Sequence, residues 1–120
     1  MSEDITYLTG AALITAVVPA GRAEDMLEAA RNVGASGGIV HQARGTGARE
    51  LFGLLGIAVE AEKEVVSIVV AEEYQELVAR AIFHAGGLGN PGGGYLYVTP
   101  LEKLATFIPR ETMTRLRDRS

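Results

Sequence analysis

Residues 64–84 read EVVSIVVAEEYQELVARAIFH, and the change of pattern within this stretch decides the fold. The first part, residues 64–70, is dominated by β-branched side chains, which favour a strand. From Glu72 to His84 the apolar residues instead recur at helical spacing and predict a helix with one core-facing stripe. That stripe consists of Tyr74, Leu77, Val78, Ala81 and Ile82.

The same succession of strand and helix occurs nearer the N-terminus. Residues 8–18 are rich in Leu, Ile, Val and Thr and predict a strand that stops at Pro19. A helix is expected from Ala23 to Val33, because acidic residues open its first turn and Gly34 follows its last.

Two more strands, at residues 38–43 and 95–98, complete the pattern, and Pro100 is expected to end the second. The order βαβ followed by βαβ predicts an α+β, ferredoxin-like fold with a four-stranded antiparallel sheet and two helices on one face. A chain of 120 residues has room for one such domain.

The strands predict that both faces of this sheet are buried. Two helices cover one face only, and a solvated second face would show alternating apolar and polar residues. Apolar residues instead occupy both faces of two strands: Val66, Ile68 and Val70 against Val65 and Val69, and Ile14, Ala16 and Val18 against Leu13 and Val17. We therefore expect the second face to pack against other copies of the chain in a closed homo-oligomer.

Composition limits the classes of function. Hydrophobic residues make up 48% and charged residues 22%, as in a globular domain, and the net charge of −4 argues against nucleic acid as a partner. The absence of cysteine excludes disulfides and thiolate metal sites. The longest apolar stretch, residues 11–18, is far short of the ~20 residues of a bilayer span, and the acidic start is unlike a secretory leader, so we expect a cytoplasmic protein without membrane insertion.

Three clusters could form a ligand site: residues 44–49 after the second strand, residues 60–63 before the third, and residues 86–94 before the fourth. The last is dense in glycine, which lets backbone N–H groups approach an anion closely, although a mobile loop would have the same composition. It matches neither a Walker A loop nor the dinucleotide-binding fingerprint. Lys63 could meet a phosphate, or pair at the surface with Glu62 or Glu64.

The sequence offers little evidence for a catalytic site or a metal site. His41 and His84 have no carboxylate at metal-ligand spacing, and no serine lies in a nucleophile-elbow context. We expect no catalytic residues and no metal. Two alternatives stay open: a CutA-like structural or metal-tolerance trimer, and a small ferredoxin-like enzyme with His41 or Glu62 as its base.

These clusters, in this order and on this fold, resemble the PII-type nitrogen-regulatory signal-transduction family. The resemblance runs from about Ala12 to Phe107 and rests on six segments, at residues 13–19, 26–29, 34–38, 45–47, 63–70 and 92–98. It implies a homotrimer of one-domain regulators with an adenine nucleotide (AMP, ADP or ATP) in each cleft between subunits and no tightly bound cofactor. It also implies a shortened T-loop at 48–62 that docks onto a membrane transporter or metabolic enzyme, a glycine-rich B-loop at 86–94, and a polar tail at 109–120.

The resemblance also assigns candidate ligand contacts. Lys63 takes the place of the phosphate-binding lysine, the B-loop glycines would wrap the phosphates, and three residues in the second and third strands would lie near the base. Arg49 stands nearest to the position of a glutamine that helps to bind magnesium and 2-oxoglutarate. The full set is Ile39, Gly45, Thr46, Gly47, Arg49, Lys63, Ser67, Val69, Gly89, Gly92, Gly93 and Gly94.

Departures from the family pattern point to an altered ligand. Phe52 replaces the tyrosine of uridylylated members, which excludes that modification. Thr106 and Ile108 replace two arginines that clamp phosphates, which argues against ATP in particular. AMP, ADP, a cyclic nucleotide or a small anion is therefore expected. The apolar segment 51–59 predicts either a short packed helix or a patch that docks onto a partner.

Overall fold

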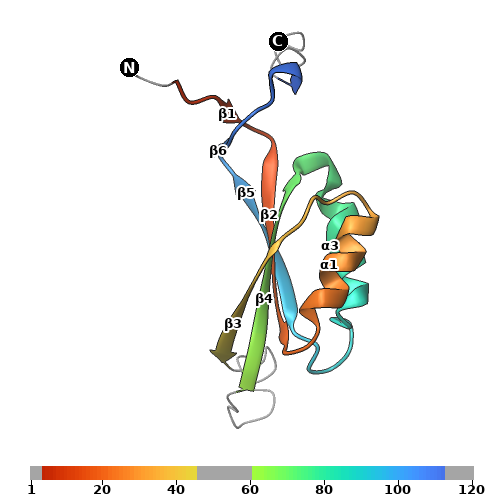
Figure 1. Cartoon of the computed structure of the whole chain (residues 1–120). Helices are drawn as coiled ribbons and strands as arrows, with labels where there is room; N and C mark the ends of the chain where they lie inside the picture. Colours follow the sequence, from red (N-terminus) through yellow and green to blue (C-terminus); the bar gives the residue numbers. More distant parts are fainter. Residues whose placement is uncertain (1–3, 46–60, 113–120) are drawn as a thin grey trace.

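The computed structural model describes residues 4–45 and 61–112, which adopt an α+β architecture (Figure 1). Along the chain these residues form β1 (Tyr7–Leu8), β2 (Ala11–Pro19), α1 (Ala23–Asn32), β3 (Ile39–Gly45), β4 (Ala61–Ala71), the 3-10 turn η1 (Glu72–Tyr74), α3 (Gln75–Ala85), β5 (Tyr95–Leu101) and β6 (Leu104–Ala105). The larger sheet has the antiparallel order β3-β4-β2-β5, and α1 and α3 lie on one of its faces. The predicted ferredoxin-like fold is confirmed.

The core lies between the sheet and this helix layer. Ile14 of β2 lies opposite Ile68 of β4, and both side chains are fully buried. Met26 of α1 and Ile82 of α3 close over them and are also fully buried. Burying a side chain of this size stabilises a fold by about 1.5–3 kcal/mol, so this layer supplies much of the driving force for folding.

The helical stripe predicted for the second helix is wrong at its N-terminal end. Val78 and Ile82 are buried, but Tyr74 is 51% and Leu77 is 48% exposed. Tyr74 belongs to the 3-10 turn η1, whose tighter winding breaks the 3.6-residue period assumed from the sequence. Leu77 lies about 100° round the helix axis from Val78 and so faces away from the sheet.

The strand boundaries also differ from the prediction, most clearly in β5 and β4. Pro100 does not end β5, which continues to Leu101 with Pro100 opposite Ala12. Because β5 is an edge strand, a residue without an N–H is tolerated there. β4 begins at Ala61 rather than Glu64, since its first residues pair with the end of β3, where Ala61 lies opposite Gly45.

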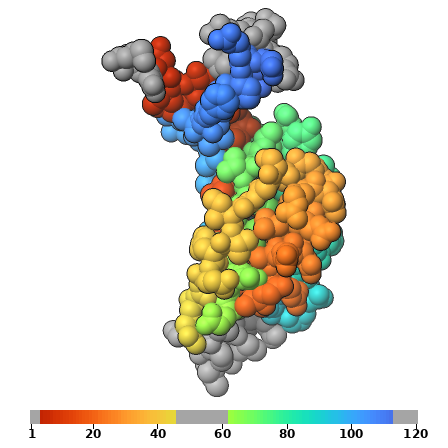
Figure 2. Space-filling model, in the orientation of Figure 1, coloured from red at the N-terminus to blue at the C-terminus, as the bar shows by residue number. Residues whose placement is uncertain are grey.

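A small second sheet joins the two ends of the described chain. β1 pairs with β6, with Tyr7 opposite Ala105, and the ammonium group of Lys103 lies 4.4 Å from the centre of the Tyr7 ring. In the space-filling view these segments project beyond the body formed by the helices and the larger sheet (Figure 2). No pattern in the sequence predicted this pair.

The face of the larger sheet opposite the helices is covered by no described part of this chain (Figure 1). We call it the helix-free face; the β2–β4 register places Leu13, Val17, Val65 and Val69 on it. Large apolar side chains remain open there, with Ile39 68%, Tyr97 50% and Val69 41% exposed. As predicted, the strands lack apolar–polar alternation and carry apolar residues on both faces of the sheet.

Candidate functional site

The described residues of the three clusters lie at one end of the larger sheet. Here β3 ends at Gly45, and β4 runs past Lys63, which lies opposite both Ala43 and Pro19. β5 begins at Tyr95, directly after the glycine-rich segment. We call this end, with Gly45, Lys63 and residues 86–94, the loop end. Thr46, Gly47 and Arg49 lie outside the described residues.

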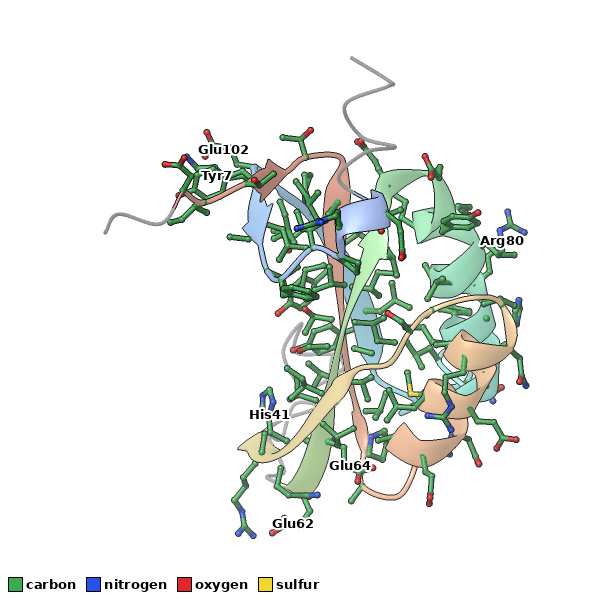
Figure 3. The ribbon with its side chains drawn as sticks, turned by 45° about the horizontal axis from the view of Figure 1, so that its top comes forward. Tyr7, His41, Glu62, Glu64, Arg80 and Glu102 are labelled. Carbon is green, nitrogen blue, oxygen red and sulfur yellow. The ribbon has the colours of Figure 1, made fainter. Side chains whose placement is uncertain are left out.

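Lys63 is half-buried on the helix-free face, while its two acidic neighbours lie on the opposite face because side chains alternate along a strand. Glu62 is engaged with Arg44, at 3.8 Å between its carboxylate oxygen and the guanidinium. Glu64 accepts hydrogen bonds from the start of α1 and points from β4 toward that helix (Figure 3). The geometry therefore does not favour the surface pairing of Lys63 with Glu62 or Glu64.

Residues 86–94, here called the glycine loop, form a closed series of turns. The N–H of Asn90 donates to the carbonyl of Gly87 at 3.1 Å, and that of Gly93 donates to the carbonyl of Asn90 at 3.0 Å. Gly94 has a φ of +102°, and a Cβ there would overlap the carbonyl oxygen of Val17. Only glycine fits this approach, so the loop is packed against β2 by its backbone.

A residue that the sequence analysis did not single out fastens this loop. The guanidinium of Arg22 donates through Nη1 to the carbonyl of Gly86 at 2.6 Å, a partly buried contact between residues 64 positions apart. The same nitrogen occupies the space that a side chain on Gly87 would need. In the sequence, only the glycine at position 87 indicated a close approach, and it did not indicate which residue approaches.

The N-terminus of α1 is held by Glu64. One carboxylate oxygen, Oε1, accepts the N–H of Gly21 at 2.7 Å and the N–H of Ala23 at 3.0 Å. These bonds favour the charged carboxylate, with the Ala23 bond as the largest cause, and outweigh partial desolvation, so the pKa of Glu64 lies below its usual value. The carboxylate is therefore ionised at neutral pH.

The three residues expected near a base lie together on the helix-free face, away from the loop end. Ile39 lies opposite Ser67, and Val69 follows two residues later on the same face. Val69 also lines a cavity of about 210 Å³, together with Gly34, Ala35, Ser36, Val70, Ala71, Tyr74 and Val78. The sequence analysis did not identify Ser36 or Tyr74 as lining residues.

The two groups of candidates do not form one pocket within a single subunit. Lys63 and Val69 are six residues apart on β4, which corresponds to about 20 Å along an extended strand. Both lie on the helix-free face, one at each end of β4. A small ligand cannot touch both in the same chain, so the subunit presents two half-sites.

The positions that replace the family's arginine clamp lie elsewhere. Thr106 and Ile108 line a cavity of about 200 Å³ with Asp4 and Thr6, beside the β1–β6 pair. Its lining contains an acidic side chain and hydroxyl groups but no cation. This cavity is unsuited to an anionic ligand.

The candidates for other chemistry do not come together. His41 lies on the helix-free face opposite Val65, whereas Glu62 lies on the helix face, so the two candidate bases share no site. Across residues 4–45 and 61–112, no group of three His, Cys, Asp or Glu side chains could hold a metal ion. None of the helices in these ranges has the length and apolar character of a bilayer span.

Comparisons with known proteins agree with this architecture. A solved structure of Arabidopsis thaliana PII bound to citrate is similar to this chain, with a TM-score of 0.62 and 23% sequence identity over 79% of this chain and 78% of that one. No curated protein matches the sequence. The sequence profile of the family described as "Nitrogen regulatory protein P-II" matches residues 11–111. The resemblance inferred from the residues is thereby confirmed: the chain belongs to the P-II nitrogen regulatory protein family.

Proposed function

We propose that this protein is a cytoplasmic PII-type regulator that binds an adenine nucleotide, or another small anion, in clefts between the subunits of a homotrimer. Through a T-loop it would regulate a membrane transporter or a metabolic enzyme. Its family consists of non-catalytic regulators that form trimers and bind small effectors. The observation that carries the proposal is that the helix-free face bears a glycine- and lysine-containing loop end at one end of β4 and an apolar half-site, Ile39 and Val69, at the other.

The two half-sites complement each other chemically. Lys63 supplies a positive charge at the loop end, and the backbone of Gly92, Gly93 and Gly94 offers the close approach that a phosphate requires. The other half-site, around the exposed side chains of Ile39 and Val69 on the helix-free face, suits an apolar ring. In a closed ring of subunits the loop end of one copy faces the apolar half-site of the next.

The helix-free face supports this assembly. Ile39, Val69 and Tyr97 are each at least 41% exposed there, and a soluble protein rarely leaves such a contiguous apolar surface open. Packing this face against neighbouring copies buries it and brings half-sites together across the seam. Gly45 would enter the cleft from the end of β3 and Gly89 from the glycine loop. Thr46, Gly47 and Arg49 would enter it from the segment after β3.

The remaining anatomy follows the family pattern with changes. The shortened T-loop, expected at 48–62, would end at residue 60, because Ala61 and Glu62 already belong to β4. Residues 86–94 would form the B-loop and residues 109–120 a polar tail. Phe52 in the T-loop removes the site of uridylylation. With Thr106 and Ile108 in place of two arginines, the cleft has fewer cations for a triphosphate, which favours AMP, ADP or a cyclic nucleotide over ATP. Because the Arabidopsis protein was solved with citrate, small carboxylates are candidate ligands as well.

Calorimetry on the full chain tests this function. The panel is AMP, ADP, ATP, cyclic AMP and citrate, and light scattering first establishes that the sample is a folded trimer. Saturable binding of at least one nucleotide supports the proposal. If the folded trimer binds citrate alone, the ligand is an anion without a base, and if it binds nothing in the panel, the effector-binding proposal is wrong.

A further inference from the structure

Two sets of hydrogen bonds link the glycine loop and the Lys63 end of β4 to the same three residues. Arg22, just before α1, bonds to the glycine loop, and its neighbours Gly21 and Ala23 bond to Glu64 of β4. The segment 21–23 therefore touches both elements to which we assign anion binding. None of these three residues is among the ligand contacts that the family resemblance assigns.

On the loop side, the contact lies where the chain leaves α3. The Arg22 guanidinium donates to the Gly86 carbonyl at 2.6 Å and lies over Gly87. The Gly87 carbonyl in turn accepts the N–H of Asn90 at 3.1 Å and contacts Gly93 so closely that a Cβ on Gly93 would overlap it. A charged hydrogen bond at the Gly86 carbonyl thus holds the peptide directly before the one on which Gly93 rests.

On the strand side, the contact lies one residue from Lys63. Oε1 of Glu64 accepts N–H groups from Gly21 at 2.7 Å and Ala23 at 3.0 Å, on the helix face of the sheet. Lys63 points to the opposite face, so Glu64 does not neutralise it. Since adjacent backbone positions move together, fixing Glu64 also fixes the position of Lys63.

We propose that Arg22 and Glu64 are positioning residues that hold the glycine loop and the Lys63 end of β4 in one arrangement for binding an anion. The inference rests on the proposed function, in which both elements contact the same ligand. It adds that the start of α1 is the brace between them. Without the brace, every group that contacts the ligand is still present, but the distances between these groups vary more. Binding is therefore weakened although no contact is removed.

Hydrogen exchange on the free trimer tests the brace without any ligand. Arg22→Ala is expected to speed exchange of the amides of Gly87 to Gly94 at least fivefold, while exchange in the middle of α3 stays as in the wild type. Arg22→Lys keeps one donor and should restore at least half of the protection. The control is Arg80→Ala, which removes an arginine of α3 whose ion pair with Glu76, at 2.9 Å, is exposed. If hydrogen exchange in Arg22→Ala is the same as in the wild type, the proposed brace is wrong.

Calorimetry with ADP then tests positioning. Arg22→Ala and Glu64→Ala should each weaken ADP binding at least fivefold, Arg22→Lys should recover part of the loss, and Arg80→Ala should bind as the wild type does. Faster loop exchange with unaltered ADP affinity would show a structural role only and overturn the proposal. A wild-type trimer that binds neither a nucleotide nor citrate contradicts the proposed function, and the exchange result on the free protein distinguishes this outcome from a failure of the brace.

Discussion

Glu64 of β4 accepts the backbone N–H of Ala23 at 3.0 Å and so caps α1 from a strand 41 residues away in the sequence. The residue at the N-cap position, Arg22, supplies no side-chain cap of its own. The first N–H groups of a helix lack partners within the helix, and here a distant carboxylate satisfies one of them. The cap is tertiary, and it depends on the charge of Glu64.

Replacing Glu64 by alanine should lower the free energy of unfolding by about 1 kcal/mol at pH 7, the usual loss for a helix cap. The pKa of Glu64 is lowered in the folded state, so its contribution is complete above the ordinary value of 4.5 and disappears as the pH falls through the folded-state value. Urea unfolding at a series of pH values from 7 down to 3 measures this. The variant and the wild type should converge at the acid end. Glu28→Ala, at an exposed position of α1, is the control, and an equal loss for Glu64→Ala at every pH would contradict a charge-dependent cap.

Lys63→Ala should weaken nucleotide binding at least tenfold, which corresponds to about 1.4 kcal/mol, because it removes the one lysine that the described sheet presents at the loop end. Its stability should stay within about 0.5 kcal/mol of the wild type, as expected for a half-buried surface charge. Titration calorimetry with ADP measures the affinity. Lys103→Ala, at the β1–β6 pair, serves as the control, and an affinity of Lys63→Ala equal to that of Lys103→Ala would refute the assigned role.

Gly94→Ala should destabilise the fold by at least about 2 kcal/mol, since it adds a side chain at positive φ and forces an overlap with β2. The φ of Gly94 is +102°, and its missing Cβ would lie against the Val17 carbonyl. The matched control is Gly45→Ala, where a Cβ meets nothing within 4 Å. Thermal unfolding compares them: equal midpoints for the two variants would mean that the loop does not pack as described.

Val65→Asp should convert the proposed trimer into a folded monomer of 12.7 kDa. Val65 lies on the helix-free face, so the core between sheet and helices stays intact, while a charge in the subunit interface is desolvated without a partner. Sedimentation velocity gives the mass and circular dichroism the fold. Leu77→Asp places the same charge on the exposed surface of α3 and should remain trimeric. A trimeric Val65→Asp would mean that copies associate through another surface.

Local pattern was enough to predict the fold. β-branched runs placed β2 and β4, and the glycine after α1 marked its end correctly, since Gly34 has a φ of +104°. Local pattern did not predict the structure where strand pairing or a change in helical winding determines it. The polar start of β4 is a strand only because β3 pairs with it, and the exposure of Tyr74 follows from a 3-10 turn whose winding the period does not reveal.

The candidate site was predictable only in part, for the same reason. Glycine density marked the loop before β5, and the resemblance marked Lys63, but composition could not distinguish a mobile loop from packed turns. Arg22 and Glu64 gave no signal, because their roles arise from contacts across 64 and 41 residues of sequence. Ser36 became a candidate only when the fold placed it in a cavity with Val69.

The most direct measurement of a cleft shared between subunits is complementation in mixed trimers. One chain carries Lys63→Ala, which impairs the loop end, and the other carries Val69→Trp, which fills the apolar half-site on the helix-free face. Each is expected to bind nucleotide poorly as a homotrimer. Co-expressed with different tags and purified through both, the mixed trimers contain a seam with two intact halves and should regain wild-type affinity at about one site per trimer. Mixed trimers that bind no better than either parent would contradict a ligand held between neighbouring copies.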